Sequence, residues 1–253
     1  MNIERHEKIM SLLEQKGAVS VRELAIQLGC TEMTVRRNLD QLQQQGQVKR
    51  EHGYARLVKT SNLTSYDQQH SEHMAEKRAI ASAALTLIEP GMNICLDSGT
   101  TIQQLVEMIP GDFPLSVITS SLSAAMTLAG KPSVQTLMPG GFIHHRNRSL
   151  LIDRADELHR YQSDIAFLAC QSFQIPGGTF EYSQTLTNTK RALASVANRK
   201  VLLLDYTKWN IRSIFNCLAL EEIDLIVTDD KAPEDKVAQA REAGKVVLLV
   251  HAE

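Results

Sequence analysis

The segment TEMTVRRNLDQLQQQG, residues 31–46, predicts an amphipathic helix. Val35, Leu39 and Leu42 recur at i, i+4 and i+7, so they share the face that turns toward a core. Because an α-helix has about 3.6 residues per turn, Arg37 lies almost opposite those three side chains. The segment therefore combines a buried apolar face with an exposed face that carries a guanidinium group.

The residues before this segment predict two shorter helices. Ser20 stands three residues before Glu23, which is the spacing of a capping box at the start of a helix. Gly29 and Cys30 then form a short break, and Thr31 can cap the helix that follows. Two helices joined by about three turn residues form a helix-turn-helix. The apolar positions of the two earlier helices are Ile9, Leu12, Leu13, Val21, Leu24, Ala25 and Leu28.

The segment QVKREHGYARL, residues 47–57, predicts a basic β-hairpin, because Gly53 lies between two short extended runs. Cations on such a wing can contact phosphates, and the first turns of the preceding helix can meet base edges in the major groove. Two alternatives stay open, namely that the arginines are simply solvated and that the winged helix contacts protein. The candidate DNA-binding residues are Thr31, Met33, Thr34, Arg36, Arg37, Lys49, Arg50 and His52.

The charges divide unevenly along the chain. Residues 1–59 hold ten Lys or Arg against seven Asp or Glu, and residues 60–253 hold seventeen against twenty-two. The balance is therefore +3 for the first part and −5 for the second. An anionic partner is expected to meet the basic N-terminal part.

The composition is that of a globular protein, with 43% hydrophobic and 22% charged residues in a chain of 253. No run approaches the ~18 apolar residues of a membrane helix, and MNIERHEKIM is too charged for a signal peptide. The four cysteines stand singly, which favours reduced thiols over a zinc site. We therefore expect a cytoplasmic protein with no membrane partner, no metal and no cofactor.

The remainder of the chain predicts an α/β domain. Short apolar runs, such as NICLD, LSVIT, IAFLAC and DLIVTD, alternate with helical stretches that include residues 101–109, 121–129 and 183–197. This alternation indicates a largely parallel sheet. Residues before it lack a clear apolar period. The expected division is a winged helix-turn-helix domain over 1–58, a linker over 59–75 and an α/β effector-sensing domain over 76–253.

Ligands of such domains bind beyond the carboxyl ends of the strands. The most informative strand end is DSGTT, residues 97–101, where a small, hydroxylated, Gly-containing turn leads into a helix. Backbone N–H groups and the positive end of the helix favour an anion, above all phosphate, although such turns also serve as plain N-caps. No G-x-x-x-x-G-K-[ST] motif occurs, which argues against a nucleoside triphosphatase.

Two lysines are candidates for the point charge that a phosphate requires. Lys208 follows a strand end at Asp205, and Lys190 lies on the helix before that strand. Either lysine could equally be solvated. His144, His145, Arg146 and Arg148 follow the Gly140–Gly141 turn, and they are weaker candidates for an effector lid, because a solvated loop explains them as well.

The N-terminal motifs, from Arg5 through VSVRELAIQLGCTEMTVRRNLDQLQQQGQVKREHGYA, resemble the DNA-binding domain of DeoR-family bacterial repressors. The chain departs from the usual pattern at Cys30–Thr31, at Asn38 in place of Asp, and at Tyr54 in place of a second Gly. The resemblance implies a double-stranded operator DNA as partner.

Over residues 72–250 the motifs EKRAIA, DSGTT, TSSL, GG, DIAF, DYTKW and IDLIVTD resemble, in order, the effector domain of the same family. The resemblance implies a fold related to ribose-5-phosphate isomerase and glucosamine-6-phosphate deaminase, and a phosphorylated sugar as effector. Ser120 and Trp209 depart from the residues usual at their positions. The implied effector-binding residues are Asp97, Ser98, Gly99, Thr100, Thr101, Thr119, Ser120, Gly140, Gly141, Lys190, Asp205 and Lys208.

The sequence thus predicts a transcriptional repressor, acting as a homodimer or homotetramer, that a sugar phosphate releases from its operator. The alternative is a sugar-phosphate isomerase or deaminase that carries a DNA-binding domain. No convergent acid–base set can be identified in the sequence, so no catalytic residue is assigned and we expect no enzyme. Deoxyribose-5-phosphate is a candidate effector, and hexose, hexitol and ketose phosphates remain open.

Overall fold

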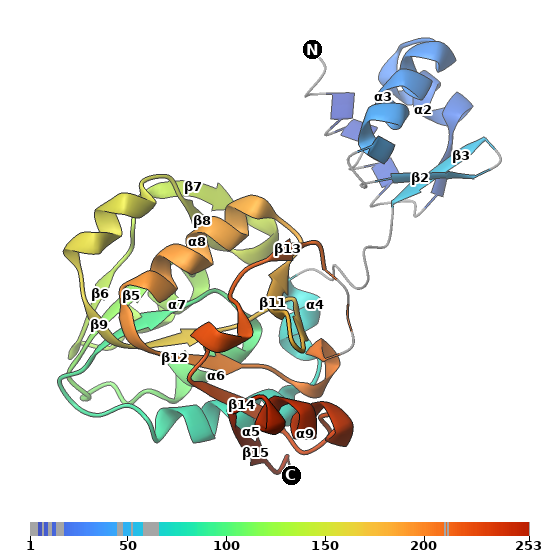
Figure 1. The fold of residues 1–253 in the computed structure, drawn as a ribbon. Helices are drawn as coiled ribbons and strands as arrows, with labels where there is room; N and C mark the ends of the chain where they lie inside the picture. The colour runs from blue at the N-terminus through green and yellow to red at the C-terminus, as the bar shows by residue number, and fades with distance from the viewer. Residues whose placement is uncertain are drawn as a thin grey trace. The chain divides into compact units, whose positions relative to one another are not determined.

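The computed structural model describes residues 5–6, 8–9, 12–13, 18–44, 48–51, 53–57, 66–209, 211 and 213–252. The chain divides into two compact units, Met1–Leu63 and Thr64–Glu253 (Figure 1). Each unit has hydrophobic core residues of its own. Residues 66–71 of the expected linker form helix α4 (Tyr66–Ser71) in the second unit, and residues 58–65 lie outside the described part of the chain.

The first unit contains the predicted helix-turn-helix. The Ser20 side chain accepts a hydrogen bond from the Glu23 backbone N–H at 3.1 Å and so caps the first helix of the pair. That helix ends at Gly29, whose φ of 60° lies in the left-handed region that glycine tolerates. The second helix is capped by Thr31, whose hydroxyl accepts from the Thr34 N–H at 3.3 Å. The two helices are α2 (Val21–Leu28) and α3 (Glu32–Gln44).

The wing of the first unit is a three-stranded antiparallel sheet in the order β1-β3-β2. The hairpin β2–β3 turns at Gly53, which has a φ of 83°. The predicted hairpin is therefore confirmed, whereas the additional strand β1 was not expected. Val35, Leu39 and Leu42 of α3 are buried in one core with residues of the wing. The strands are β1 (Ala18–Ser20), β2 (Val48–Glu51) and β3 (Tyr54–Leu57).

The second unit is built on a seven-stranded sheet in the order β15-β14-β12-β9-β4-β5-β6, with every neighbouring pair parallel. The predicted apolar runs NICLD, LSVIT, IAFLAC and DLIVTD form strands of this sheet, which confirms the α/β prediction. The strands are β4 (Asn93–Leu96), β5 (Leu115–Thr119), β6 (Val134–Leu137), β9 (Ser163–Leu168), β12 (Ala197–Leu203), β14 (Leu225–Asp229) and β15 (Val246–Val250).

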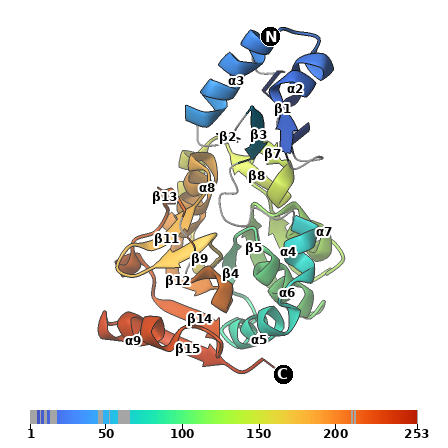
Figure 2. The same ribbon diagram turned by 90° about the vertical axis from the view of Figure 1, so that its right-hand side faces the viewer.

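Helices cover both faces of this sheet, because successive strand residues point to opposite sides. Ile94 and Leu96 of β4 belong to one core cluster and Cys95 to the other. The first cluster includes residues of α5 (Met74–Leu85), α6 (Thr100–Met108) and α7 (Leu122–Leu128), and the second includes residues of α8 (Gln184–Ser195) and α9 (Glu234–Glu242). Figure 2 shows these helices on the two sides of the sheet.

Two small antiparallel elements complete the second unit, and neither was expected from the sequence. One is the sheet β10-β11-β13 and the other is the hairpin β7–β8. The hairpin depends on Gly141, because a Cβ at this position would lie 2.1 Å from the Leu151 carbonyl oxygen. The strands are β7 (Gly141–His144), β8 (Ser149–Ile152), β10 (Ser172–Gln174), β11 (Gly178–Glu181) and β13 (Phe215–Asn216).

Candidate functional site

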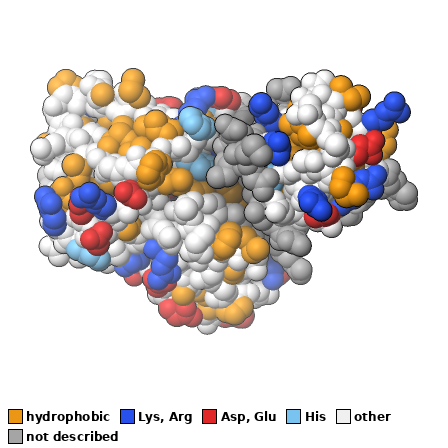
Figure 3. All heavy atoms as spheres, turned by 90° about the horizontal axis from the view of Figure 1, so that it is seen from above, with side chains coloured by type: hydrophobic (Ala, Val, Ile, Leu, Met, Phe, Trp, Pro, Cys, Tyr) orange, Lys and Arg blue, Asp and Glu red, His pale blue; other side chains and the backbone are white. Residues whose placement is uncertain are grey.

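The outer face of α3 carries the side chains that the sequence predicted there. Met33 is 64% exposed, and Arg36 and Arg37 are exposed beside it. Arg36 forms a 3.5 Å ion pair with Glu32 on the same helix, whereas no ion pair joins Arg37 to another described residue. Lys and Arg side chains are visible over the surface of the first unit in Figure 3.

Two polar side chains of this helix have local structural partners. The Thr31 and Thr34 hydroxyl oxygens lie 3.0 Å apart. Asn38 is only 4% exposed, and its amide donates to the Thr34 carbonyl at 2.7 Å. The side chain at position 38 is therefore buried, and its amide N–H has a backbone acceptor one turn earlier in the helix.

An ion pair connects α3 to the wing. Arg50 of β2 donates to the carboxylate of Asp40, so this cation of the wing is partly neutralised. Among the other predicted wing contacts, the Lys49 side chain and His52 lie outside the described residues. The described basic side chains at the surface of the first unit thus include the α3 arginines and Arg50, together with the exposed Lys8, Arg22 and Arg56.

In the second unit, polar residues converge at the carboxyl ends of three adjacent strands, β4, β9 and β12. From β4 the chain continues outward to β5 and β6, and from β9 it continues to the other edge of the sheet, so the topological switch point lies between β4 and β9. A cavity of about 60 Å³ opens here. It is lined by Tyr66, Gln69, Ser98, Gly99, Thr100, Thr101, Arg146, Asn147, Ala169, Cys170, Gln171, Glu181, Tyr182, Lys190, Leu203, Leu204, Asp205 and Lys208.

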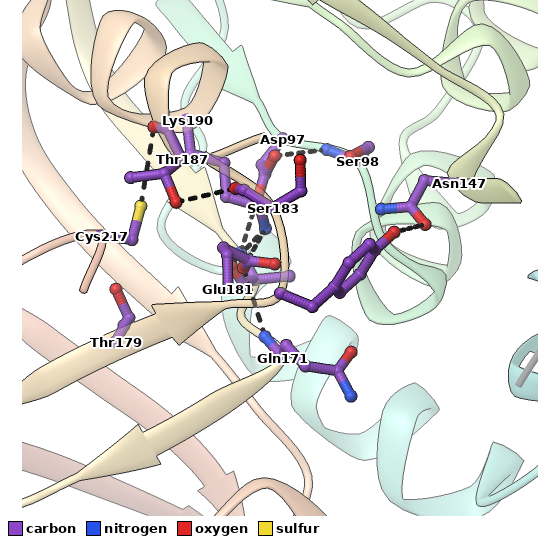
Figure 4. Close-up of polar contacts among 12 residues, drawn as sticks. Asp97, Ser98, Asn147, Gln171, Thr179, Glu181, Ser183, Thr187, Lys190 and Cys217 are labelled. Carbon is purple, nitrogen blue, oxygen red and sulfur yellow. Dashed lines mark hydrogen bonds and ion pairs between the residues drawn. The ribbon is translucent and has the colours of Figure 1, made fainter. Parts of the chain in front are cut away.

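A buried ionic cluster forms the floor of this cavity. The Lys190 ammonium lies 2.6 Å from Asp97 Oδ2 and 3.0 Å from Glu181 Oε1, and it also donates to the Ala169 carbonyl at 2.7 Å. Figure 4 shows the side chains of Asp97 and Glu181 converging on Lys190. Asp97 further accepts hydrogen bonds from the Ser98 and Ala169 N–H groups. The cluster therefore ties the end of β4 to α8 and β11.

Burial shapes the proton affinities in the cluster. Burial raises the pKa of Glu181 above its ordinary value, although Lys190 opposes that shift. Burial also disfavours the ammonium of Lys190, but the carboxylates of Asp97 and Glu181 outweigh it and raise its pKa. Lys190 thus remains charged and is already paired with protein carboxylates, so it is not available as a separate phosphate ligand.

Lys208 is the better placed cation. It ends the short 3-10 helix η3 (Tyr206–Lys208), which begins after the β12 strand end, and it lines the cavity. Among the described residues, no carboxylate forms an ion pair with its ammonium. Asp205 caps η3 by accepting from the Thr207 backbone N–H at 3.0 Å. The predicted Lys208 therefore lines the same cavity as the residues 98–101 turn, and no described carboxylate forms an ion pair with it.

Five predicted effector residues do not line this cavity, namely Asp97, which lies in the ionic cluster beneath it, and Thr119, Ser120, Gly140 and Gly141. Thr119 is fully buried and donates to the Leu96 carbonyl at 2.8 Å, and Ser120 is also fully buried. Gly140 and Gly141 line a second cavity of about 450 Å³ beside β7. The close approach of β7 to β8 leaves no room for a side chain at Gly141, so a glycine is required here whether or not a ligand binds nearby. We therefore do not include Thr119, Ser120, Gly140 and Gly141 in the proposed site.

The sequence did not assign several residues that the structure adds to the site. Glu181 and Tyr182 lie at the end of β11, whose short strand has no clear apolar pattern. Arg146 and Asn147 come from the 3-10 helix η1 (His145–Asn147), and Asn147 accepts from the Tyr182 hydroxyl at 2.6 Å. Of these, Arg146 was considered as part of a possible lid. Tyr66 and Gln69 come from α4, a segment expected to be linker.

No helix in the described ranges has both the length and the apolar character that a membrane crossing requires. Among solved structures, ribose 5-phosphate isomerase A of Methanocaldococcus jannaschii matches 53% of this chain and 53% of its own, with a TM-score of 0.40 and 20% identity.

The comparisons with known proteins cover nearly the whole chain. The HTH-type transcriptional regulator GolR of Listeria innocua is 32% identical over 248 residues, which is 97% of this chain and 98% of the relative. The glycerol-3-phosphate regulon repressor of Escherichia coli is 26% identical over 91% of this chain and 92% of its own. The DeoR-like helix-turn-helix domain matches residues 5–61 and the DeoR C terminal sensor domain matches residues 72–230. The chain belongs to the DeoR family of transcriptional regulators.

Proposed function

We propose that this protein is a repressor that leaves its operator DNA when a phosphorylated sugar binds at the carboxyl ends of β4, β9 and β12. The observation that carries the proposal is that Lys208 lines the same cavity as the residues 98–101 turn, at the N-terminus of α6. The first N–H groups of a helix have no intrahelical acceptor, and they favour an anion together with the helix dipole.

The remaining lining residues suit a sugar rather than a bare anion. The hydroxyls of Ser98, Thr100 and Thr101 and the amides of Asn147 and Gln171 surround the cavity. Such groups donate and accept hydrogen bonds, as a polyol requires. One relative is named a glycerol-3-phosphate regulon repressor, which supports a phosphorylated polyol or sugar as the class of effector. Deoxyribose-5-phosphate remains one candidate among several.

The DNA contacts are proposed on the outer face of α3 and on the wing. Thr31, Met33, Thr34, Arg36 and Arg37 lie at or near the start of α3, where a recognition helix contacts base edges. Lys49, Arg50 and His52 of the wing are proposed to contact phosphates. Because one short helix covers too few base pairs to select an operator, we propose that two or more copies bind together as a homodimer or homotetramer.

A thermal-shift panel followed by gel shifts tests this function. The panel contains deoxyribose 5-phosphate, glycerol 3-phosphate, hexose, hexitol and ketose phosphates, and each unphosphorylated parent sugar. We expect at least one phosphorylated compound to raise the melting temperature and to release an operator selected from random duplexes, whereas its unphosphorylated parent does neither. A panel in which no phosphorylated compound binds would contradict the proposed effector class.

The enzymatic alternative has one observation in its favour, namely a cavity carboxyl, Glu181, with a raised pKa. However, both Lys190 and the Gln171 N–H already donate to its Oε1. A coupled assay for aldose–ketose isomerisation separates the two functions. We expect no turnover above the uncatalysed rate with any sugar phosphate that releases the operator.

A further inference from the structure

Helix α4 lies outside both parts of the chain that match the DeoR family, residues 5–61 and 72–230. It nevertheless contributes Tyr66 and Gln69 to the lining of the cavity. In the chain, residues 58–65 join it directly to β3 of the DNA-binding unit. A segment that falls between the two family domains is thus part of the ligand cavity and is also the first described segment after the wing.

The cavity is too small to receive a sugar phosphate as it stands. Its volume is about 60 Å³, whereas pockets for small molecules typically measure about 300–1,000 Å³. One wall must therefore move when a ligand enters. The strand ends and the Lys190 cluster are held by the buried sheet, whereas α4 has only six residues and is too short to be stable without its contacts.

One contact that holds α4 in place is exposed to solvent. The Arg148 guanidinium lies 2.6 Å from the Asp67 carboxylate and 5.0 Å from the centre of the Tyr66 ring. Exposed ion pairs contribute little to stability, so the Arg148–Asp67 ion pair can open at small cost, whereas the Tyr66 side chain is buried. Arg148 follows directly on η1, whose Arg146 and Asn147 also line the cavity. A ligand that shifts η1 would therefore act on α4.

The other end of α4 is connected to the phosphate side of the cavity. The buried Lys77 ammonium donates to the carbonyls of Gln69 and Glu72 at the C-terminal end of α4. The last carbonyls of a helix have no intrahelical donor, so Lys77 supplies one. His73, in the left-handed turn after α4, lies 3.4 Å from the Tyr206 hydroxyl. Tyr206 belongs to the same 3-10 helix as Lys208. A phosphate that moves Lys208 therefore shifts an element in contact with the α4–α5 turn.

We propose that α4 is a movable wall of the effector site and that its displacement by the ligand is coupled to operator binding by the DNA-binding unit. This inference rests on the proposed function, since it concerns the regulation of the same site. By linkage, operator binding must act on α4 in return, with the same coupling factor. The effect of operator binding on α4 can be tested without knowing the effector.

Hydrogen exchange of the full chain provides that test. We expect the amides of residues 66–72 to change their exchange at least threefold when saturating operator is added, and those of α9 to stay unchanged. If the exchange of residues 66–72 is the same with and without operator, the inference is overturned. This outcome does not depend on any sugar phosphate, so it is distinct from failure of the effector panel.

Two neighbouring glutamines test the wall itself by calorimetry with deoxyribose 5-phosphate and glycerol 3-phosphate. Gln69 lines the cavity, whereas Gln68 is exposed on the same helix and does not. We expect Gln69→Ala to weaken the binding of whichever probe binds by at least fivefold, and Gln68→Ala to stay within twofold. Equal affinities of the two variants would overturn the assignment of α4 to the site. If neither probe binds the unsubstituted protein, the exchange experiment decides the inference alone.

Discussion

The Lys190 ammonium lies 2.6 Å from Asp97 Oδ2, although the two residues are 93 positions apart, and their side chains are 6% and 1% exposed. Such a buried pair is stable only if its geometry and additional hydrogen bonds offset the loss of hydration. Here Glu181 and the Ala169 carbonyl supply those additional contacts. The pair therefore fixes the end of β4, from which the residues 98–101 turn begins, and so positions the site indirectly.

Replacement of Lys190 by methionine is expected to destabilise the second unit by about 3–5 kcal/mol, because Asp97 and Glu181 would remain buried without their cation. Urea unfolding measures the change. Lys236→Met is the matched control, since the Lys236 ammonium lies 3.9 Å from the exposed Asp235 carboxylate at the surface of α9, and its loss should cost less than about 1 kcal/mol. Equal losses in the two variants would contradict a structural role of the buried cluster.

The raised pKa of Glu181 predicts a pH-dependent effect of Glu181→Gln. Because the folded-state pKa lies above the unfolded value near 4.5, the charged carboxylate disfavours folding at neutral pH. We expect Glu181→Gln to be more stable than the unsubstituted protein at pH 7. This difference should shrink as the pH falls through the raised pKa and vanish below the ordinary one. A gain that persists at acid pH would refute the shift.

The ion pair between Asp40 and Arg50 predicts a variant with stronger DNA binding. Asp40→Asn removes a negative charge from α3 and frees Arg50 of the wing for a phosphate. We expect tighter operator binding and a salt dependence that is steeper by about one phosphate contact. Gel shifts at several salt concentrations measure both quantities. Asp235→Asn, in the second unit, is the control and should change neither; weaker binding of Asp40→Asn would contradict the proposed wing contact.

The close packing around Gly99 allows a steric test of the residues 98–101 turn. A Cβ at Gly99 would lie 2.9 Å from the Ala169 Cβ, whereas a Cβ at Gly111 would meet no atom within 4 Å. We expect Gly99→Ala to weaken effector binding at least fivefold, because the turn or the end of β9 must shift. Gly111→Ala should leave the affinity unchanged, as measured by calorimetry. Normal effector binding by Gly99→Ala would place the site elsewhere.

The α/β architecture was predictable because the seven sheet strands are short, apolar and separated by helical periods. Their periodicity reflects burial on both faces, which depends on local sequence. The positions of Lys208 and of the residues 98–101 turn were predictable for a related reason. Both come shortly after a strand, and the carboxyl ends of parallel strands meet at one edge of the sheet.

Contacts between distant segments were not predictable. Nothing near Lys190 in the sequence shows that two carboxylates, 93 and nine positions away, would bury its charge. Helix α4 was missed because six polar and aromatic residues carry too little apolar periodicity to stand out from a linker. Gly140 and Gly141 were predicted from their position after a strand end, and the structure places them beside the β7 hairpin, where they line a second cavity.

Lys208→Met is the most direct test of how the cavity acts on DNA. The variant removes the cavity cation that has no carboxylate partner among the described residues, so a phosphorylated effector should bind about 1.5–3 kcal/mol more weakly. Operator binding without effector should be unchanged, because Lys208 lies in the second unit. Linkage then requires the operator complex of the variant to survive effector concentrations that release the unsubstituted protein, while Lys236→Met responds normally. Gel shifts across an effector titration measure this directly.

A Lys208→Met variant that is released at the same effector concentration as the unsubstituted protein would remove Lys208 from the site. One that fails to bind operator at all would show that η3 supports the fold rather than the ligand.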